Sequence, residues 1–166
     1  MTYSFTGHRP NKLGGYDDKI NHSLIDFACT KLEQLKPDKC ISGMAQGWDQ
    51  VVAAACTRLH IYWIAAIPFP GQADIWGKEG KLTWELLLIH ANEVKYVSPS
   101  FSVPNLQKRN EWMVDNSDHV IALHDGSKGG TFNCVKYAKT QGKPITNWWD
   151  EWTLFNSDIS NIFLDI

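Results

Sequence analysis

Three short segments of the sequence carry residues that could bind an anion. The first is Thr6-Gly7-His8-Arg9-Pro10, the second is Ser42-Gly43-Met44-Ala45-Gln46-Gly47-Trp48-Asp49, and the third follows Asp125 and contains Gly129-Gly130-Thr131. Glycine allows a ligand to approach the backbone closely, and backbone N–H groups at the start of a helix bind phosphate or carboxylate oxygens. Arginine and histidine add charge-assisted hydrogen bonds to the same oxygens. The three segments therefore indicate a site for a nucleotide-like ligand.

The glycine-rich segments do not match the common nucleotide-binding motifs. Neither the segment that ends at Asp49 nor the segment that contains Gly129-Gly130-Thr131 fits GxGxxG or GxxxxGK[ST]. The sequence therefore does not indicate an NAD-dependent dehydrogenase or a P-loop NTPase. The cysteines form no CxxC pair and have no histidine at zinc-ligand spacing; they are Cys29, Cys40, Cys56 and Cys134. We therefore expect reduced thiols, no metal site and no required cofactor.

Three charged residues are candidates for a catalytic role, and each has a structural alternative. Asp49 follows Gly47 in the second segment and could hydrogen-bond ribose hydroxyls or act as a base, or it could cap a helix. Asp125 could bind sugar hydroxyls or form an Asx turn. Arg109 could point toward a strand end or lie on the surface. His8 is expected in an exposed loop, where it would donate to phosphate or serve the structure.

Aromatic residues could contact a flat base. We predict that Trp48 and Trp76 stack on the base and that Pro68 and Phe69 form a wall beside it. Three other tryptophans lie on apolar faces and are expected in the core, namely Trp63, Trp84 and Trp112. Trp148 and Trp149 could instead form a subunit interface.

Strand-like and helix-like stretches alternate along the chain and must position these residues. Short apolar or β-branched runs predict strands at 2–6, 39–42, 60–67, 93–97, 119–124 and 144–148. Helical spacing predicts helices at 20–35, 47–58, 75–91, 107–116 and 130–140. This alternation predicts an α/β fold, a single-domain Rossmann-like three-layer sandwich around a mostly parallel sheet. In such sheets ligands bind outside the carboxyl ends of the strands, where all three segments fall.

The last residues of the chain continue the same domain. We assign 1–149 to the Rossmann-like domain and 150–166 to a C-terminal tail that packs on it. Trp152, Phe155, Ile159 and Ile162 follow helical spacing, so the tail is expected to form a short helix. A bound tail and a dimer contact would give the same pattern.

Length and charge limit the classes of partner. The chain has 166 residues, enough for one domain, and 16 Lys and Arg against 18 Asp and Glu give a net charge of −2. A chain without an overall basic field is not expected to bind nucleic acid or an anionic membrane. The sequence has no long apolar run, and its first residues lack the pattern of a signal peptide, so we expect a cytoplasmic protein.

The motifs together carry a family resemblance. The two segments ending at Pro10 and Asp49, Arg109-Asn110 with Ser117-Asp118, and Gly129-Gly130-Thr131 resemble the SLOG superfamily, in particular its YpsA-like branch. That superfamily includes the DprA/SMF and LOG proteins, and the resemblance covers residues 2 to about 148. It implies a Rossmann-like fold, loops that hold nucleotides or nucleotide-derived ligands such as ADP-ribose species, and homodimers.

Compared with the LOG enzymes, this sequence keeps some of the catalytic pattern and changes the rest. Those enzymes cleave the N-glycosidic bond of nucleoside 5′-monophosphates with an Arg from an Arg-Lys pair and a Glu from PGGxGTxxE. Here Arg109 is retained while Asn110 replaces the Lys, and Gly130-Thr131 are retained while Cys134 stands in the place of the Glu. A neutral thiol neither stabilises positive charge on the sugar nor orients water as a carboxylate does.

Two functions follow from this comparison. The first is a binding protein that captures a nucleotide or an NAD- or ADP-ribose-type molecule as a sensor, carrier or sequestering protein. The second is a nucleotide N-glycosidase that uses Asp49 or Asp125 with Arg109. The expected ligand-binding residues are Thr6, Gly7, His8, Arg9, Ser42, Gly43, Met44, Ala45, Gly47, Trp48, Asp49, Pro68, Arg109, Asn110, Asp125, Gly129, Gly130 and Thr131.

Overall fold

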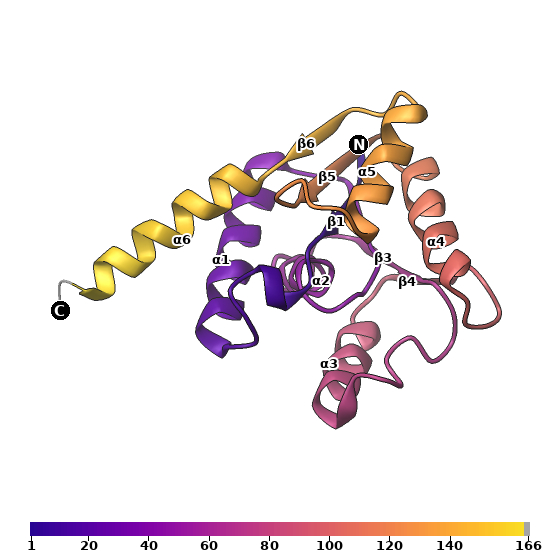
Figure 1. The fold of residues 1–166 in the computed structure, drawn as a ribbon, viewed down its shortest axis with the longest axis horizontal. Helices are drawn as coiled ribbons and strands as arrows, with labels where there is room; N and C mark the ends of the chain where they lie inside the picture. The colour runs from indigo at the N-terminus through magenta and orange to yellow at the C-terminus, as the bar shows by residue number, and fades with distance from the viewer. Residues whose placement is uncertain (165–166) are drawn as a thin grey trace.

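The computed structural model describes residues 1–164 and has one six-stranded sheet with helices on both faces (Figure 1). The strands are β1 (Thr2–Gly7), β2 (Lys39–Ser42), β3 (Trp63–Ile67), β4 (Glu93–Tyr96), β5 (His119–Leu123) and β6 (Ile145–Asn147). The helices are α1 (Asp18–Leu35), α2 (Trp48–Arg58), α3 (Gly77–Ile89), α4 (Val103–Asp115), α5 (Gly130–Thr140) and α6 (Trp149–Leu164), with a 3-10 turn η1 at Pro10–Lys12. The predicted α/β, Rossmann-like class is confirmed, and the sheet is parallel at every strand pair.

The strand order β4-β3-β2-β1-β5-β6 creates a reversal beside β1. From β1 the chain moves outward through β2 and β3 to β4, and then crosses back to place β5 on the other side of β1. Thr6 and Gly7 of β1 lie in register with Ala122 and Leu123 of β5. A doubly wound sheet has its ligand crevice at such a reversal, because the loops on either side turn away in opposite directions.

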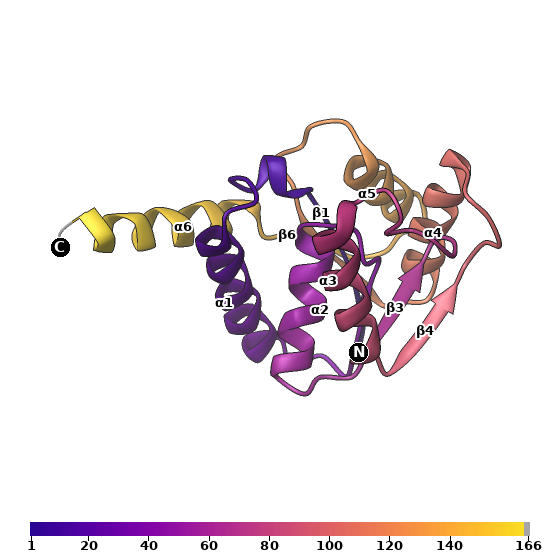
Figure 2. The same cartoon turned by 90° about the horizontal axis from the view of Figure 1, so that it is seen from below.

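The helices divide between the two faces of the sheet. In Figure 2, α1, α2 and α3 lie on one side of the strands and α4 and α5 on the other. Under the first group the core contains Phe5, Trp63 and Ile67, all at most 1% exposed. Under the second group Ile41, Ala66 and Met113 form a smaller cluster. Burial on both faces explains the apolar runs of β3 and β5, whereas the edge strand β4 is exposed and polar.

Local signals fix the ends of the helices. The side chain of Asp17 accepts a hydrogen bond from the Lys19 N–H at 2.7 Å and caps α1. The same helix ends at Lys36, which has a φ of 51° and precedes Pro37. Helix α4 begins after Ser102, whose hydroxyl accepts from the Asn105 N–H at 3.1 Å. The caps at Asp17 and Ser102 hold the loops after β1 and β4 at the carboxyl edge of the sheet, and Lys36 ends α1 at the opposite edge.

Helix α6 packs on the body only along its first half. Trp152 and Phe155 contact Phe27 of α1, with ring centroids 5.5 and 5.4 Å apart. Farther along, the helix extends away from the sheet, as Figure 1 shows in yellow. Trp148, just before α6, is 4% exposed and packs against Phe5, so it belongs to the core. Residues 165–166 of the predicted tail lie outside the described residues, and the domain division stays a prediction.

Two of the tryptophans expected in the core are confirmed there. Trp63 and Trp84 are 1% and 9% exposed, and Trp112 is partly buried against the cluster under α4. Within residues 1–164, none of the helices is long and apolar enough to cross a membrane.

Candidate functional site

Arg109 is a buried charge at the carboxyl edge of the sheet. It comes from the middle of α4, and its side chain is 6% exposed. Its Nη1 donates to the carbonyl oxygen of Gly43, and its Nε donates to Asn110 Oδ1 at 3.0 Å. These bonds hold the guanidinium against the end of β2, so the prediction that Arg109 points toward a neighbouring strand end is correct and the surface alternative is wrong.

Gly43 is required because Arg109 and Asp49 occupy the space that a side chain would fill. A Cβ built on Gly43 would lie 2.6 Å from Arg109 Cζ and 2.8 Å from Asp49 Oδ2. The two charged groups therefore approach the same backbone position from opposite elements, α4 and α2. The glycine allows the protein's own side chains to pack, whereas the sequence suggested that it makes room for a ligand.

Asp49 lies in the first turn of α2 and is 6% exposed. Burial raises the pKa of its carboxyl, and the nearby positive charges of Arg109 and Arg9 act in the opposite direction. Burial likewise lowers the pKa of Arg109, while Asp49 raises it. The site thus holds two opposite charges. Burial disfavours the charged form of each group, and the opposite charge of its neighbour stabilises it.

One polar atom of each group remains available. In the described residues, Arg109 Nη2 and Asp49 Oδ1 form no hydrogen bond. The fully buried side-chain atoms that lack a partner are the indole nitrogens of Trp48 and Trp63, so Nη2 and Oδ1 both retain contact with accessible space. A donor and an acceptor are therefore left at the surface of an otherwise satisfied cluster.

The segment Ser42 to Ala45 does not form the anion cradle that the sequence predicts. The Met44 N–H donates to Ser42 Oγ at 3.2 Å, and the Ala45 N–H donates to Asp49 Oδ2 at 3.4 Å. Ser42 Oγ in turn donates to the backbone oxygen of Asp49 at 2.6 Å. The N–H groups of Met44 and Ala45 are thus engaged by the protein, and Met44 is fully buried. The loop serves to position Asp49 and Arg109.

Helix α2 also has its first N–H engaged. Trp48 N–H donates to the carbonyl oxygen of His8 at 3.1 Å, and Gly47, with a φ of 94°, has that carbonyl within 2.4 Å of where its Cβ would stand. The turn therefore locks the β1 and β2 loops together. The glycine is explained by close approach of two backbones at a positive φ.

The start of α5 is the open part of the edge. A Cβ built on Gly129 or Gly130 meets no atom within 4 Å, and the first N–H groups of a helix have no partner within it. Asn110 Nδ2 donates to the Gly130 oxygen at 3.5 Å and so links this turn to Arg109. Thr131, in the same first turn, is half-buried. The sequence-predicted Gly129-Gly130-Thr131 segment thus lies beside Arg109 with space in front of it.

Cys134 lies one turn further along α5 and is 1% exposed. Burial raises the pKa of its thiol to about 12, and a hydrogen bond with Thr6 and the charge of Arg109 oppose this effect. The thiol is neutral at physiological pH. Thr6 is itself buried at the end of β1.

His8 and Asp125 form a second polar pair, on the β1 and β5 loops. His8 Nε2 lies 2.8 Å from Asp125 Oδ1, and that oxygen also accepts from the N–H and the hydroxyl of Ser127 at 2.9 and 2.6 Å. The Ser127 hydrogen bonds and then the His8 contact hold the pKa of Asp125 well below its usual range. The Asx-turn alternative for Asp125 is correct. The expected exposure of His8 is wrong, because its ring is 7% exposed against Trp149.

The predicted base-stacking residues have different surroundings. Trp48 is fully buried and packs against Phe27, so the prediction that its ring stacks on a ligand is wrong. A Cβ built on Gly7 would lie within 2.6 Å of this ring, so the Trp48 side chain leaves no room for a larger residue at this position. Trp76 is half-buried, and the exposed Arg9 has its Cζ 6.0 Å from the Trp76 ring centroid. Trp76 and Arg9 remain accessible from the same side.

The predicted wall on the β3 loop is buried. Pro68 is buried at the end of β3, and Phe69 packs edge-to-face on Phe101 at 5.2 Å. The same loop supplies a residue that sequence reasoning missed. Gln72 is 5% exposed, donates to the Gly43 oxygen at 3.0 Å and accepts from Trp84 Nε1 at 2.9 Å. A glutamine directly after Pro-Phe-Pro-Gly at a strand end was the available signal.

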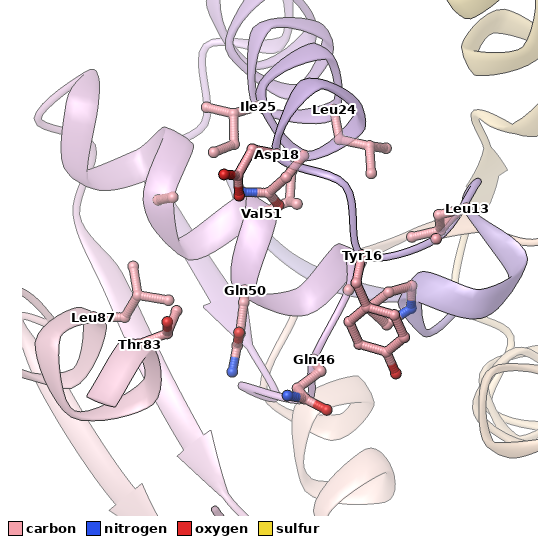
Figure 3. A pocket seen from close by; sticks show the side chains of 15 residues that line it. Leu13, Tyr16, Asp18, Leu24, Ile25, Gln46, Gln50, Val51, Thr83 and Leu87 are labelled. Atoms are coloured by element: carbon pink, nitrogen blue, oxygen red, sulfur yellow. The ribbon is translucent and has the colours of Figure 1, made fainter. Parts of the chain in front are cut away.

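A separate recess lies on the other face of the sheet. It has a volume of about 340 Å³ and lies between η1, α1, α2 and α3, with Tyr16, Asp18 and Gln50 among the side chains around it (Figure 3). Leu24 and Leu87 contribute apolar surface. Gln46 and the predicted ligand-binding residue Gly47 line this recess, whereas Asp49, Arg109 and Gly130 do not, so the recess is separate from the Arg109 cluster.

Comparison with known proteins gives a family match and several related folds. The model of the YspA SLOG family matches residues 3–148. The chain is 37% identical over 117 residues to the uncharacterized SPbeta prophage-derived protein YoqJ of Bacillus subtilis, a match covering 60% of this chain and 68% of YoqJ.

Two solved structures share the fold at low identity. The first is DNA processing protein A (DprA) from Streptococcus pneumoniae, with a TM-score of 0.63 at 16% identity over 88% of this chain and 49% of that one. The chain thus spans about half the length of that protein. The second is DprA from Helicobacter pylori, described for its single-stranded DNA binding mode, with a TM-score of 0.62 at 14% identity over 97% of this chain and 81% of that one.

Proposed function

Because the chain belongs to the YspA SLOG family, we propose that it binds a nucleotide or nucleotide-derived small molecule at the carboxyl edge of its sheet. Such a protein would act as a sensor, carrier or sequestering protein for an NAD- or ADP-ribose-type ligand. Thr6 and Gly7, Ser42 to Ala45, and Asn110 would support the site, while Asp49, Arg109 and the first turn of α5 would contact the ligand.

The observation that carries this proposal is the partly satisfied Arg109–Asp49 cluster. Burying two charges is costly, and a structure retains such groups where they serve a function more often than elsewhere. Arg109 keeps Nη2 free, and Asp49 keeps Oδ1 free, as described above. A phosphate oxygen could accept from Arg109 Nη2, and a sugar hydroxyl could donate to Asp49 Oδ1, without displacing an existing hydrogen bond.

The start of α5 supports an anionic group in the ligand. The N–H groups of its first turn and the positive end of the helix dipole favour a phosphate oxygen, and a Cβ built on Gly129 or Gly130 meets no atom within 4 Å. Arg9 and Trp76 provide a cation and an aromatic face on the rim. We therefore expect a phosphate at α5 and Arg109, with the organic part extending toward the rim.

Catalysis at the same site is the second candidate function, and Asp49 favours it over Asp125. In an N-glycosidase, water adds to the anomeric carbon, the bond to the base breaks, and the base leaves with a proton. Asp49 has a raised pKa and a free oxygen beside Arg109, which suits a group that exchanges protons. Asp125 is held ionised by Ser127 and His8, and the neutral Cys134 thiol does not supply a base.

Binding of single-stranded DNA is a further possibility that the binding experiment below also tests. The Helicobacter pylori DprA structure is described for that binding mode, and it shares only the fold with this chain. The expectation of no nucleic acid partner rests on the net charge of −2. An oligonucleotide that binds this chain would show the strong salt dependence of phosphate contacts.

The test is calorimetric titration of the purified protein with inorganic phosphate, AMP, ADP-ribose, NAD and a short single-stranded oligonucleotide, together with chromatography for released base. We expect AMP or ADP-ribose to bind more tightly than phosphate. The variant Arg109→Lys should weaken nucleotide binding at least about tenfold, because lysine loses the forked donor geometry. Lys108→Ala, an exposed neighbour on α4, is the matched control and should bind normally.

The outcomes separate the candidate functions. Released base that disappears in Asp49→Asn would establish the enzyme over the pure binding protein. An oligonucleotide that binds while mononucleotides do not would replace the small ligand with nucleic acid. Unchanged nucleotide affinity in Arg109→Lys, with the folded state verified by circular dichroism, would overturn the assignment of the site.

A further inference from the structure

Strand β4 is an open edge of the sheet. It stands last in the strand order next to β3, and all four of its residues are exposed. Figure 2 shows β4 at the margin of the molecule with no helix or strand on its outer side. An edge with unpaired N–H and C=O groups is a template for pairing with another chain.

The hydrogen bonds to β3 determine which backbone groups face outward. The Val97 N–H donates to the Ile67 oxygen at 2.9 Å, and Ile67 lies in register with Tyr96, so Glu93 and Lys95 direct their backbone groups toward β3. The alternation along a strand then directs the N–H and C=O of Val94 and Tyr96 toward the open edge. Glu93 and Lys95, which flank Val94, carry opposite charges.

This edge is complementary to itself. Two β4 strands can pair antiparallel about a two-fold axis at Val94. In that pair, Glu93 of each copy stands opposite Lys95 of the other copy. Val94 meets Val94 as a hydrogen-bonded pair, and the two Glu93–Lys95 pairs stand at the closer, non-hydrogen-bonded positions. Other symmetric registers place Glu93 opposite Glu93 of the second copy or Lys95 opposite Lys95 of the second copy. The remaining registers place a residue whose backbone groups face the open edge opposite one whose backbone groups face β3. We propose that β4 pairs with β4 of a second copy in this register, forming a homodimer with one continuous sheet.

Apolar surface beside the strand supports the same occupant. Val94 lies in register with Ala65, which packs in the core under α1 to α3. Val94 and Tyr96, 41% and 47% exposed, therefore point to the face that carries α3. A two-fold axis perpendicular to the sheet places both α3 helices on this face, on either side of the paired strands.

Helix α3 has an exposed apolar stripe that such an arrangement would partly cover. Leu82, Leu86 and Ile89 follow one helical face and are 55%, 53% and 75% exposed. A stable dimer buries roughly 1,200–2,000 Å² in total, which is more than a short strand pair supplies. The strands set the register, and α3 with Tyr96 adds the apolar contact area.

A second copy is the occupant that the charges favour. Two-fold symmetry makes every contact occur twice, so a Glu-Val-Lys strand provides its own complement. The Glu93 carboxylate already accepts a hydrogen bond from Tyr62 at 2.6 Å, which holds it on the strand. The interface lies at the far end of the sheet from β1 and β5, and it would leave the Arg109 cluster accessible.

Charge exchange tests the proposal. The wild-type chain, Glu93→Lys, Lys95→Glu and the double exchange would be compared by sedimentation velocity over the micromolar concentration range. We expect a wild-type dimer and a dissociation constant raised at least about tenfold in each single variant, because like charges then oppose each other on both sides. The double exchange Glu93→Lys with Lys95→Glu should restore the dimer.

The same geometry provides the control variants and defines the results that would contradict the proposed interface. Glu33→Lys makes the same charge change on exposed α1, and Tyr62→Phe removes only the hydroxyl that binds Glu93; both should remain dimeric. Labelled wild type should not exchange with the double variant, because mixed pairs oppose like charges. A monomeric wild type, or a dimer that the single variants leave unchanged, would overturn the interface, and a double variant as weak as the singles would overturn the register.

Discussion

At the residue scale, the glycines of this chain separate into two kinds. Gly7, Gly43 and Gly47 have no room for a Cβ because Trp48, Arg109 and the His8 backbone stand in its place. Gly129 and Gly130 have nothing within 4 Å. From the sequence alone, a glycine that makes room for a neighbouring side chain cannot be distinguished from a glycine that makes room for a ligand. The structure distinguishes the two kinds by the atoms around each glycine, and the anion site at the start of α5 stays a prediction.

Replacing Gly43 therefore tests packing. We expect Gly43→Ala to lower the free energy of unfolding by about 1–3 kcal/mol, because the new methyl group overlaps Arg109 and Asp49. Gly130→Ala is the matched control and should leave stability unchanged or slightly higher. Urea unfolding followed by tryptophan fluorescence measures both. Equal midpoints for the two variants would contradict the packing account.

Asp125 makes a pH-dependent contribution to stability. Its pKa in the folded protein lies below the unfolded value of 3.8, so its ionised form stabilises the folded state above that pH and the effect is lost as pH falls below it. Asp125→Asn should therefore be less stable than the wild type near neutral pH, and the difference should shrink below pH 4.

The measurement is the urea midpoint of both proteins between neutral pH and about pH 3.5. Glu33→Gln, an exposed carboxyl on α1 with no hydrogen bond in the described residues, is the control for general charge effects. A wild-type–variant difference that stays constant over the whole range would show that the Asp125 charge does not contribute.

At the element scale, the alternation of strands and helices could be predicted because parallel strands require crossovers and both faces are buried. The loops after β1, β2 and β5 could be placed at one edge for the same reason. The burial of Trp48 and His8 could not be predicted, because it depends on how the β1 and β2 loops lock through the His8 carbonyl. Periodicity within one element contains no information about contacts between loops.

Helix α5 should bind the anionic group through its first turn. We expect Gly130→Val to weaken phosphate and nucleotide binding at least about tenfold with the fold intact, because the side chain would occupy the open space at Gly130 in the first turn of the helix. Asn133→Val, an exposed position on the same helix, is the control and should bind normally. Calorimetric titration measures affinity, and normal binding by Gly130→Val would exclude α5 as the phosphate site.

At the scale of the whole molecule, the net charge of −2 describes the local potential poorly. Arg109 is buried beside Asp49, Arg9 is exposed beside Trp76, and the ionised Asp125 is hydrogen-bonded to Ser127 and His8. Net composition averages over these positions, so an attraction for anions at one edge is compatible with a weakly acidic chain.

Attachment of α6 is the last property of the whole molecule that the packing predicts. Trp152 is 2% exposed and packs on Phe27, whereas Leu154, two residues later on the same helix, is 65% exposed. Trp152→Ala should therefore lower the free energy of unfolding by about 3–5 kcal/mol through the cavity left beside α1. Leu154→Ala should change it by less than about 0.5 kcal/mol. If urea unfolding gave the same small loss for both variants, α6 would not be an integral part of the domain, and the contacts of Trp152 and Phe155 with α1 would not stabilise the fold.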